Sequence, residues 1–301
     1  RSTHENRRRN WTLNEVLTEP MAADAHAPTP SEYIVHHLTH FNGTGETQKS
    51  IIDFSIVNWD TVFFSVLMAT VAALLMLGAA RSIGSGVPGR FAGFFESLVE
   101  FVHEQARSIV KGDITYIAPL AFCSFLWIVL MNAMDFLPVD LLPKLWEMYY
   151  SATGRDPHHA YLRVVPTADL NGTLSLAIVV LFSTIYYGIK IKHPGGFVHE
   201  LFSAPFGSGL LLAPFNLLLQ LIEYAARCVS LGMRLFGNMF AGELVFMLIA
   251  LLGATATAWG FGLHFLLGLG WSIFHILIVV LQGFIFMMLT LVYLGQAHEG
   301  H

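Results

Sequence analysis

Three apolar segments of the chain, at about residues 59–80, 116–137 and 168–189, are each long enough to cross a membrane as a helix. A hydrocarbon core of ~30 Å requires about 20 such residues. Two further apolar patterns, from about 214 to 253 and from about 263 to 294, are longer, and no proline interrupts either. As helices they would measure roughly 58 and 48 Å, too long to stand upright in the core. We therefore expect two long, oblique helices that form a hairpin; the alternative is a break at Gly232 or Gly237.

A shorter amphipathic helix is predicted between the first two spans, within residues 81–113. Its apolar positions recur at helical spacing, opposite charged ones. The apolar set is Phe91, Phe94, Phe95, Leu98, Phe101 and Val102, and the charged set is Glu96, Glu100, Glu104 and Arg107. Both a solvated surface helix and a helix packed at the membrane interface fit this pattern.

The first fifty residues are polar and contain no apolar run. Met21 begins a stretch that resembles an ordinary amino terminus, so we expect residues 1–20 to be an extension without a role in the activity. Residues 21–58 would then be a polar N-terminal segment. Residues 59–301 would be the membrane domain, with the long hairpin at about 214–294.

Composition strengthens the membrane assignment, because 54% of the residues are hydrophobic and only 12% are charged, against about 25% in an ordinary soluble chain. We predict an all-α integral membrane protein in contact with the lipid bilayer, with about five membrane helices plus amphipathic ones. The net charge of −5 excludes nucleic acid as a natural partner. Cys123 and Cys228 lie in apolar stretches, which argues against a disulfide framework or a zinc cluster. We expect no cofactor and no metal.

Charged residues are rare in the last third of the chain. Between Leu201 and Ala297 they are Glu223, Arg227, Arg234 and Glu243. On an ideal helix the first three lie within about 40° of one another. Glu223 and Arg227 are four residues apart and can pair, in either a structural or a functional role. Arg234 has no acid three or four residues away, and because a guanidinium cannot lose its proton, it must find an anion outside its own helix.

Other polar residues join these charges on the two long helices. Gln220 and Asn238 each lie about 40° from Arg234 around the helix, whereas Glu243 lies about 180° away. On the second long helix, His275 and Gln282 share a face. In an antiparallel hairpin, His275 would reach the depth of Glu243. A titratable Glu beside a titratable His is what a proton relay needs, so we expect these two to be coupled, and their exchange to restore part of the activity that either change removes.

A third polar cluster borders the loop between the second and third spans. Its members are Asn132, Asp135, Asp140, Thr167, Asp169 and Asn171. They can cap helices or line a hydrated, acidic entrance. We favour the entrance for Asp135, which lies just inside the predicted span, and capping for Asp169.

The stretch Ser-Leu-Gly-Met-Arg-Leu-Phe-Gly-Asn-Met-Phe-Ala-Gly-Glu, residues 230–243, resembles the signature of subunit a of F-type ATP synthases. Residues 131–143, 163–169 and 274–287 are also similar to that family. The similarity extends over about residues 30–298 in the family's order, and the pairing of Glu243 with His275 resembles bacterial members.

This resemblance implies the proton-translocating stator subunit of a rotary ATP synthase in a bacterial inner membrane. The implied partners are a ring of c-type proteolipids, b-type peripheral stalk subunits and the remainder of the synthase. Arg234 would separate two offset proton half-channels that serve the ring carboxylates. The periplasmic half-channel would involve Asn132, Asp135, Asn238, Glu243, His275 and Gln282, and the cytoplasmic one Glu223 and Arg227. The family usually has its cytoplasmic acid near position 220, where this chain has Gln220.

Two other classes of function are less consistent with the sequence. A free-standing channel or transporter commonly contains internal repeats, and the two long helices have no counterpart in the first half. A zinc protease would need a second histidine after His103-Glu104, His199-Glu200 or His298-Glu299, and the chain has no phosphate-binding loop for a nucleotide. The distribution of Lys and Arg between the loops favours a cytoplasmic carboxyl terminus.

Overall fold

The computed structural model describes residues 30–42, 56–82, 84, 89–138, 140–155, 160–207, 209, 211–253, 255 and 257–298. Within these ranges the regular structure is helical, apart from one isolated bridge between Asn42 and Asn58. The all-α class is thereby confirmed for the described part of the chain. The extension predicted at residues 1–20 lies outside it.

Five of the described helices are long and apolar enough to cross a membrane. They are α3 (Trp59–Ser82), α5 (Ile117–Ala133, continued by the 3₁₀ helix η1, Met134–Phe136), α7 (Leu170–Ser203), α8 (Ala213–Gly253) and α9 (Ala258–His298). Each coincides with a predicted apolar segment. The prediction of about five membrane helices is confirmed.

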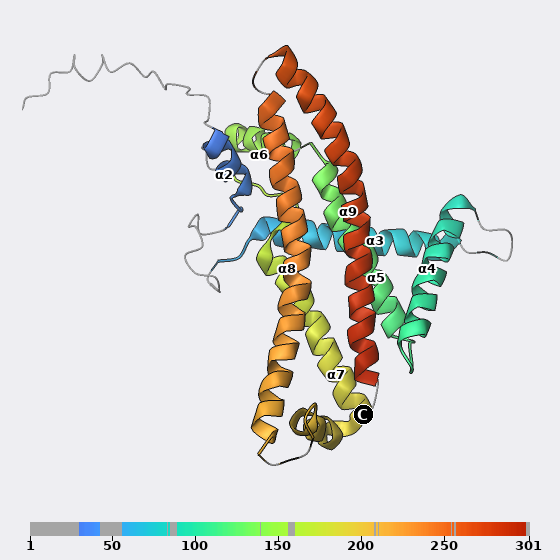
Figure 1. Ribbon diagram of the computed structural model, residues 1–301. Coiled ribbons are helices and arrows are strands. Elements are labelled where there is room, and N and C mark those ends of the chain that lie inside the picture. Colours follow the sequence, from blue (N-terminus) through green and yellow to red (C-terminus); the bar gives the residue numbers. More distant parts are fainter. Residues whose placement is uncertain are drawn as a thin grey trace, which may run out of the picture.

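The last two helices form the expected hairpin and lie side by side (Figure 1). Each has 41 residues, which corresponds to about 62 Å. α8 continues through Gly232 and Gly237, so the alternative of a break there is wrong. At Gly232 the backbone approaches α7 so closely that a Cβ would lie 2.8 Å from Cδ2 of Leu174. α3 runs crosswise to the hairpin in Figure 1.

α7 is longer than the predicted third span and contains a kink. His193 has φ 59° and ψ 156°, immediately before Pro194, and helical structure resumes and continues to Ser203. The side chain of Asp169 caps the start of α7 by accepting a hydrogen bond from the backbone N–H of Asn171 at 2.9 Å. Capping by Asp169 was predicted and is confirmed.

The predicted amphipathic helix is α4 (Arg90–Ile109). Phe95 and Val102 are buried, whereas Glu100 and Glu104 are exposed. Several other phenylalanines of the apolar set, Phe91, Phe94 and Phe101, are 40–62% exposed. An apolar surface of this kind favours a helix at the membrane interface over a solvated one.

Two short helices lie on the opposite side of the molecule from α4: α2 (Pro30–Leu38) and α6 (Leu141–Ala152) (Figure 1). α2 is attached to the start of α6, because the hydroxyl of Tyr33 donates a hydrogen bond to Oδ1 of Asp140 at 3.0 Å. Burial and the adjacent carboxylate raise the pKa of Tyr33, so the phenol stays a protonated donor at neutral pH. His37 also contacts Asp140, at 3.1 Å.

Candidate functional site

α8 presents its polar residues in two different environments. Leu231, Leu235 and Met239 form its buried face, and Glu243 continues that face one turn later. Arg234 is displaced from this face and remains partly exposed. The predicted separation of Arg234 from Glu243 around the helix therefore holds in the structure.

Arg234 has no carboxylate within ion-pair distance among the described residues. Its nearest recorded polar contact is the hydroxyl of Ser230, 3.4 Å from Nη2. One turn further along α8, Nδ2 of Asn238 donates a hydrogen bond to Oε1 of Gln282 on α9 at 2.7 Å. This bond ties the two long helices together beside the unpaired guanidinium.

Glu243 is held by Arg163, which lies in the segment between α6 and α7. Nη2 and Nε of Arg163 donate to Oε2 of Glu243 at 2.6 and 3.2 Å. The two side chains are 5% and 11% exposed. The guanidinium also lies over the ring of Phe240, 5.5 Å from its centroid. Sequence reasoning did not select Arg163 as a site residue.

His275 faces Asp135 rather than Glu243. Its Nε2 lies 2.7 Å from Oδ2 of Asp135, although the two groups are not aligned for a hydrogen bond, and His275 is fully buried. Gly242 makes this arrangement possible, because a Cβ there would lie 2.3 Å from Cε1 of His275. His275 thus reaches the depth of Glu243 as expected, but in the described structure each of the two residues has a different charged partner.

This cluster of charged residues borders a small cavity of about 40 Å³. Asp135, Arg163 and Glu243 line it together with His37 of α2. Asn132 lies nearby at the end of α5, fully buried, where its Oδ1 accepts a hydrogen bond from Thr167 at 2.7 Å. Four of the predicted residues, Asn132, Asp135, Glu243 and His275, thus belong to one polar region.

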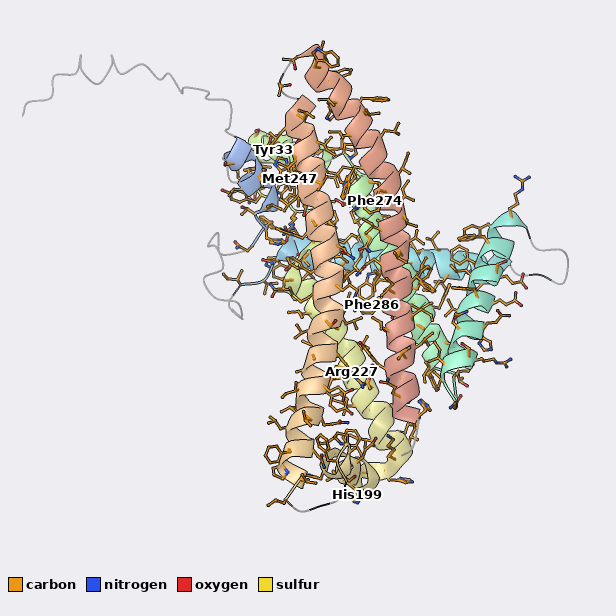
Figure 2. The ribbon with its side chains drawn as sticks, in the orientation of Figure 1. Tyr33, His199, Arg227, Met247, Phe274 and Phe286 are labelled. Atoms are coloured by element: carbon orange, nitrogen blue, oxygen red, sulfur yellow. The ribbon has the colours of Figure 1, made fainter. Side chains whose placement is uncertain are left out.

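A second, larger cavity of about 600 Å³ lies between α7, α8 and the end of α9. Its charged lining consists of Lys192, Glu200, Glu223 and Arg227, and Gln220 is also part of it. Glu223 and Arg227 form the predicted ion pair. Nζ of Lys192 contacts Oε1 of Glu200 at 2.6 Å across the kink in α7. Figure 2 shows Arg227 and Tyr33 towards opposite ends of the hairpin, so this cavity is far from the α2 side of the molecule.

Comparison with known proteins identifies the family. The profile of the family described as ATP synthase A chain matches residues 62–295. The chain belongs to the ATP synthase A chain family. It is 55% identical to "ATP synthase subunit a" of Paracidovorax citrulli and 57% identical to that of Acidovorax sp. strain JS42, in each case over 93% of this chain and 100% of the relative. The protein of the same name from Verminephrobacter eiseniae is 50% identical over the same shares.

Several charged or titratable residues of the chain were not identified from the sequence. In the sequence, Arg163 and Lys192 are indistinguishable from the other Lys and Arg residues of the loops. Asp60 and His40, which contact the same region as Arg163, were not selected. A signal was present for Asp60, since an acid at the second residue of an apolar span needs a partner. His40 lies in a polar segment, where nothing in the local pattern distinguishes it.

Proposed function

We propose that this chain is the proton-translocating stator subunit of a rotary ATP synthase. It would carry protons to and from a ring of c-type proteolipids through two offset half-channels that Arg234 separates. The observation that carries the proposal is the position of Arg234 on α8, without a carboxylate partner in the described residues, between two distinct polar cavities. The names of the relatives support the same function.

The periplasmic half-channel is assigned to the cluster at Glu243. Glu243, Asp135 and His275 are titratable groups close to one cavity, and Asn132 supplies a neutral polar side chain nearby. A series of such groups can accept and release protons in turn. Asn238 and Gln282 lie between this cluster and Arg234, where their mutual hydrogen bond would form the inner border of the half-channel.

The cytoplasmic half-channel is assigned to the larger cavity. Glu223 supplies an acid, which forms an ion pair with Arg227. The family usually has its cytoplasmic acid near position 220, where this chain has Gln220. Glu223, one helical turn further along, would take over the role of that acid. Along α8, Arg234 is about 16 Å from Glu223 and about 14 Å from Glu243. A charged barrier between two aqueous paths is therefore consistent with the spacing.

Arg234 would act as a passing partner for each ring carboxylate. A carboxylate that leaves water near this guanidinium keeps its charge, because the cation compensates for the lost hydration. The ionised carboxylate cannot carry a proton directly from one half-channel to the other. The ring must then rotate to connect them, which couples proton flow to rotation.

The orientation follows from the positive-inside rule. In Figure 1, α4, which carries Arg90 and Arg107, lies across the molecule from α6, and α7, which carries Lys190 and Lys192, runs away from α6 to the end where the carboxyl terminus lies. We assign this end, and with it the carboxyl terminus, to the cytoplasm of a bacterial cell with the chain in the inner membrane. The b-type stalk subunits would be further partners in the same ATP synthase complex.

Replacement of Arg234 tests the proposal. We expect Arg234→Ala to reduce coupled ATP synthesis by about 10²-fold or more, the scale on which loss of one well-placed charge partner acts. Passive proton flow should persist or rise in membrane vesicles stripped of the catalytic head. Arg234→Lys should also fail to couple, because an ammonium is more strongly hydrated and lacks the planar fork.

Arg155→Ala is the matched control, because Arg155 is exposed and lies over Tyr150, away from both cavities. It should couple as well as the unmodified chain. Coupled synthesis that survives in Arg234→Ala would show that Arg234 is not the barrier.

A further inference from the structure

A largely buried histidine from the N-terminal segment reaches the cluster at Glu243. Nε2 of His40 lies 3.1 Å from Nη1 of Arg163, on the side of the guanidinium that does not contact Glu243. Nδ1 of His40 lies 3.3 Å from Oδ2 of Asp60, although not aligned for a hydrogen bond. The contacts form a chain from Asp60 through His40 and Arg163 to Glu243.

The carboxylate of Asp60 links the backbone next to His40 with the backbone at Arg163. Its Oδ2 accepts hydrogen bonds from the backbone N–H of Phe41 at 2.9 Å and from that of Arg163 at 3.1 Å. Its Oδ1 accepts from the backbone N–H of Thr61 at 2.8 Å. The side chain of Asp60 has no exposed surface. Residues 41 and 163 are therefore fixed against the start of α3.

The role of His40 in this contact follows from its neighbour. A guanidinium can only donate hydrogen bonds, so Nε2 of His40 is the acceptor. The other ring nitrogen, Nδ1, lies towards the carboxylate of Asp60. In this arrangement, His40 satisfies the Arg163 donor that points away from Glu243.

We propose that His40 is a positioning residue of the periplasmic half-channel, which holds the guanidinium of Arg163 in place against Glu243. This inference rests on the proton-translocating function proposed above. Asp60 sets the position of the backbone at Arg163, and His40 sets the direction of its side chain. The N-terminal segment thereby acts on the proton pathway without touching the transferred proton.

Loss of His40 should weaken the hold of Arg163 on Glu243. A buried guanidinium with an unsatisfied N–H reorients towards another acceptor or towards water. The other titratable or charged groups around Arg163 and Glu243 are His37 on α2, Asp60 on α3, Asp135 on η1 and His275 on α9. With less positive charge beside it, the Glu243 carboxylate binds its proton more tightly. The pH range over which proton conduction changes should therefore move upward.

The test measures passive proton flux against pH on the α6 side, in sealed vesicles that contain the whole complex stripped of its catalytic head. His40→Ala should reduce the flux and shift the profile upward by about 0.5–1 pH unit, part of the effect of a neighbouring cation. His40→Gln should keep the unmodified profile, because the amide oxygen can accept from Arg163. Tyr33→Phe, which removes only the hydroxyl contact of α2 with Asp140, should not shift it.

A double variant separates positioning from a general structural role. If His40 acts through Arg163, adding His40→Ala to Arg163→Gln should produce no further shift. An unshifted profile for His40→Ala, an additive shift in the double variant, or a Tyr33→Phe shift equal to that of His40→Ala would each overturn the inference. The proposed function itself fails separately, if Glu243→Gln conducts protons normally.

Discussion

The charged and titratable residues near the smaller cavity are arranged as two partnered pairs. Arg163 holds Glu243, and His275 lies against Asp135. Removal of one partner from a buried pair typically costs about 3–5 kcal/mol, because the other charge is left uncompensated. The residues selected from the sequence were those inside apolar helices. Their partners could not be found in the same way, since Arg163 and His40 lie in polar loops and meet the site only through the tertiary fold.

This pairing leads to a prediction for Asp135. Asp135→Asn should slow passive proton flux by about 10²-fold, the lower end for loss of a positioned proton-transfer group, and His275→Ala should slow it similarly. The double variant should be no slower than the slower single one, because both changes disable one pair. Contrary to the expectation from the sequence, Glu243→His with His275→Glu should restore nothing, since it sets an imidazole against Arg163 and a second acid against Asp135.

Asp140→Asn is a suitable control in the same flux assay. Asp140 also follows the second span and contacts Tyr33 and His37, but Asp140 itself does not line the smaller cavity. Additive losses in the Asp135 and His275 double variant would argue against a functional pair, and so would a flux restored by the exchange.

At the scale of helices, the apolar pattern was sufficient to predict where the spans lie. The absence of proline after Pro214, through residue 253, correctly indicated one continuous helix, and α8 has no break. Contacts between helices were not predictable, because the sequence does not reveal which glycine faces a neighbour. Gly283 of α9 faces α5, where a Cβ would lie 2.6 Å from Cγ2 of Val129 and 3.3 Å from the backbone oxygen of Phe125.

Gly283→Ala should therefore destabilise the packing of α9 on α5. The added methyl group meets a backbone atom that cannot rotate away, and overpacking of this kind costs about 1–3 kcal/mol. Thermal unfolding of the purified protein in detergent would show a lower midpoint. Gly262→Ala is the matched control on the same helix, because no atom lies within 4 Å of a Cβ there. Equal midpoints for the two variants would contradict this account of the close approach.

At the scale of the whole molecule, α4 and α6 occupy opposite ends of the spans α3 and α5 (Figure 1). The two cavities are also displaced from one another along the hairpin. The sequence predicted part of this arrangement, because successive spans place their loops alternately on the two sides. The separation of the two cavities along α8 was not predictable, because it depends on where α7 packs. The N-terminal segment, which sequence reasoning assigned no site residue, contributes His37 to the smaller cavity.

The assigned orientation can be tested with single cysteines. In a background with Cys123→Ser and Cys228→Ser, Ser108→Cys on α4 and Ser151→Cys on α6 introduce thiols at exposed positions. A membrane-impermeant maleimide should label Ser151→Cys in intact spheroplasts and Ser108→Cys only in inverted vesicles. Labelling of both in the same preparation, or the reverse pattern, would refute the orientation.

The guanidinium of Arg234, which has no carboxylate partner among the described residues, also has a consequence for biogenesis. A charged side chain at membrane depth costs about 2.5–3.5 kcal/mol when nothing compensates for it. A partner that presents a carboxylate there recovers this free energy on docking, which corresponds to roughly 10²-fold tighter association. The same charge makes the newly made chain less stable before its partner arrives. Arg234 would thus favour the assembled complex over the free subunit, and an orphan chain would be the preferred target of membrane proteases.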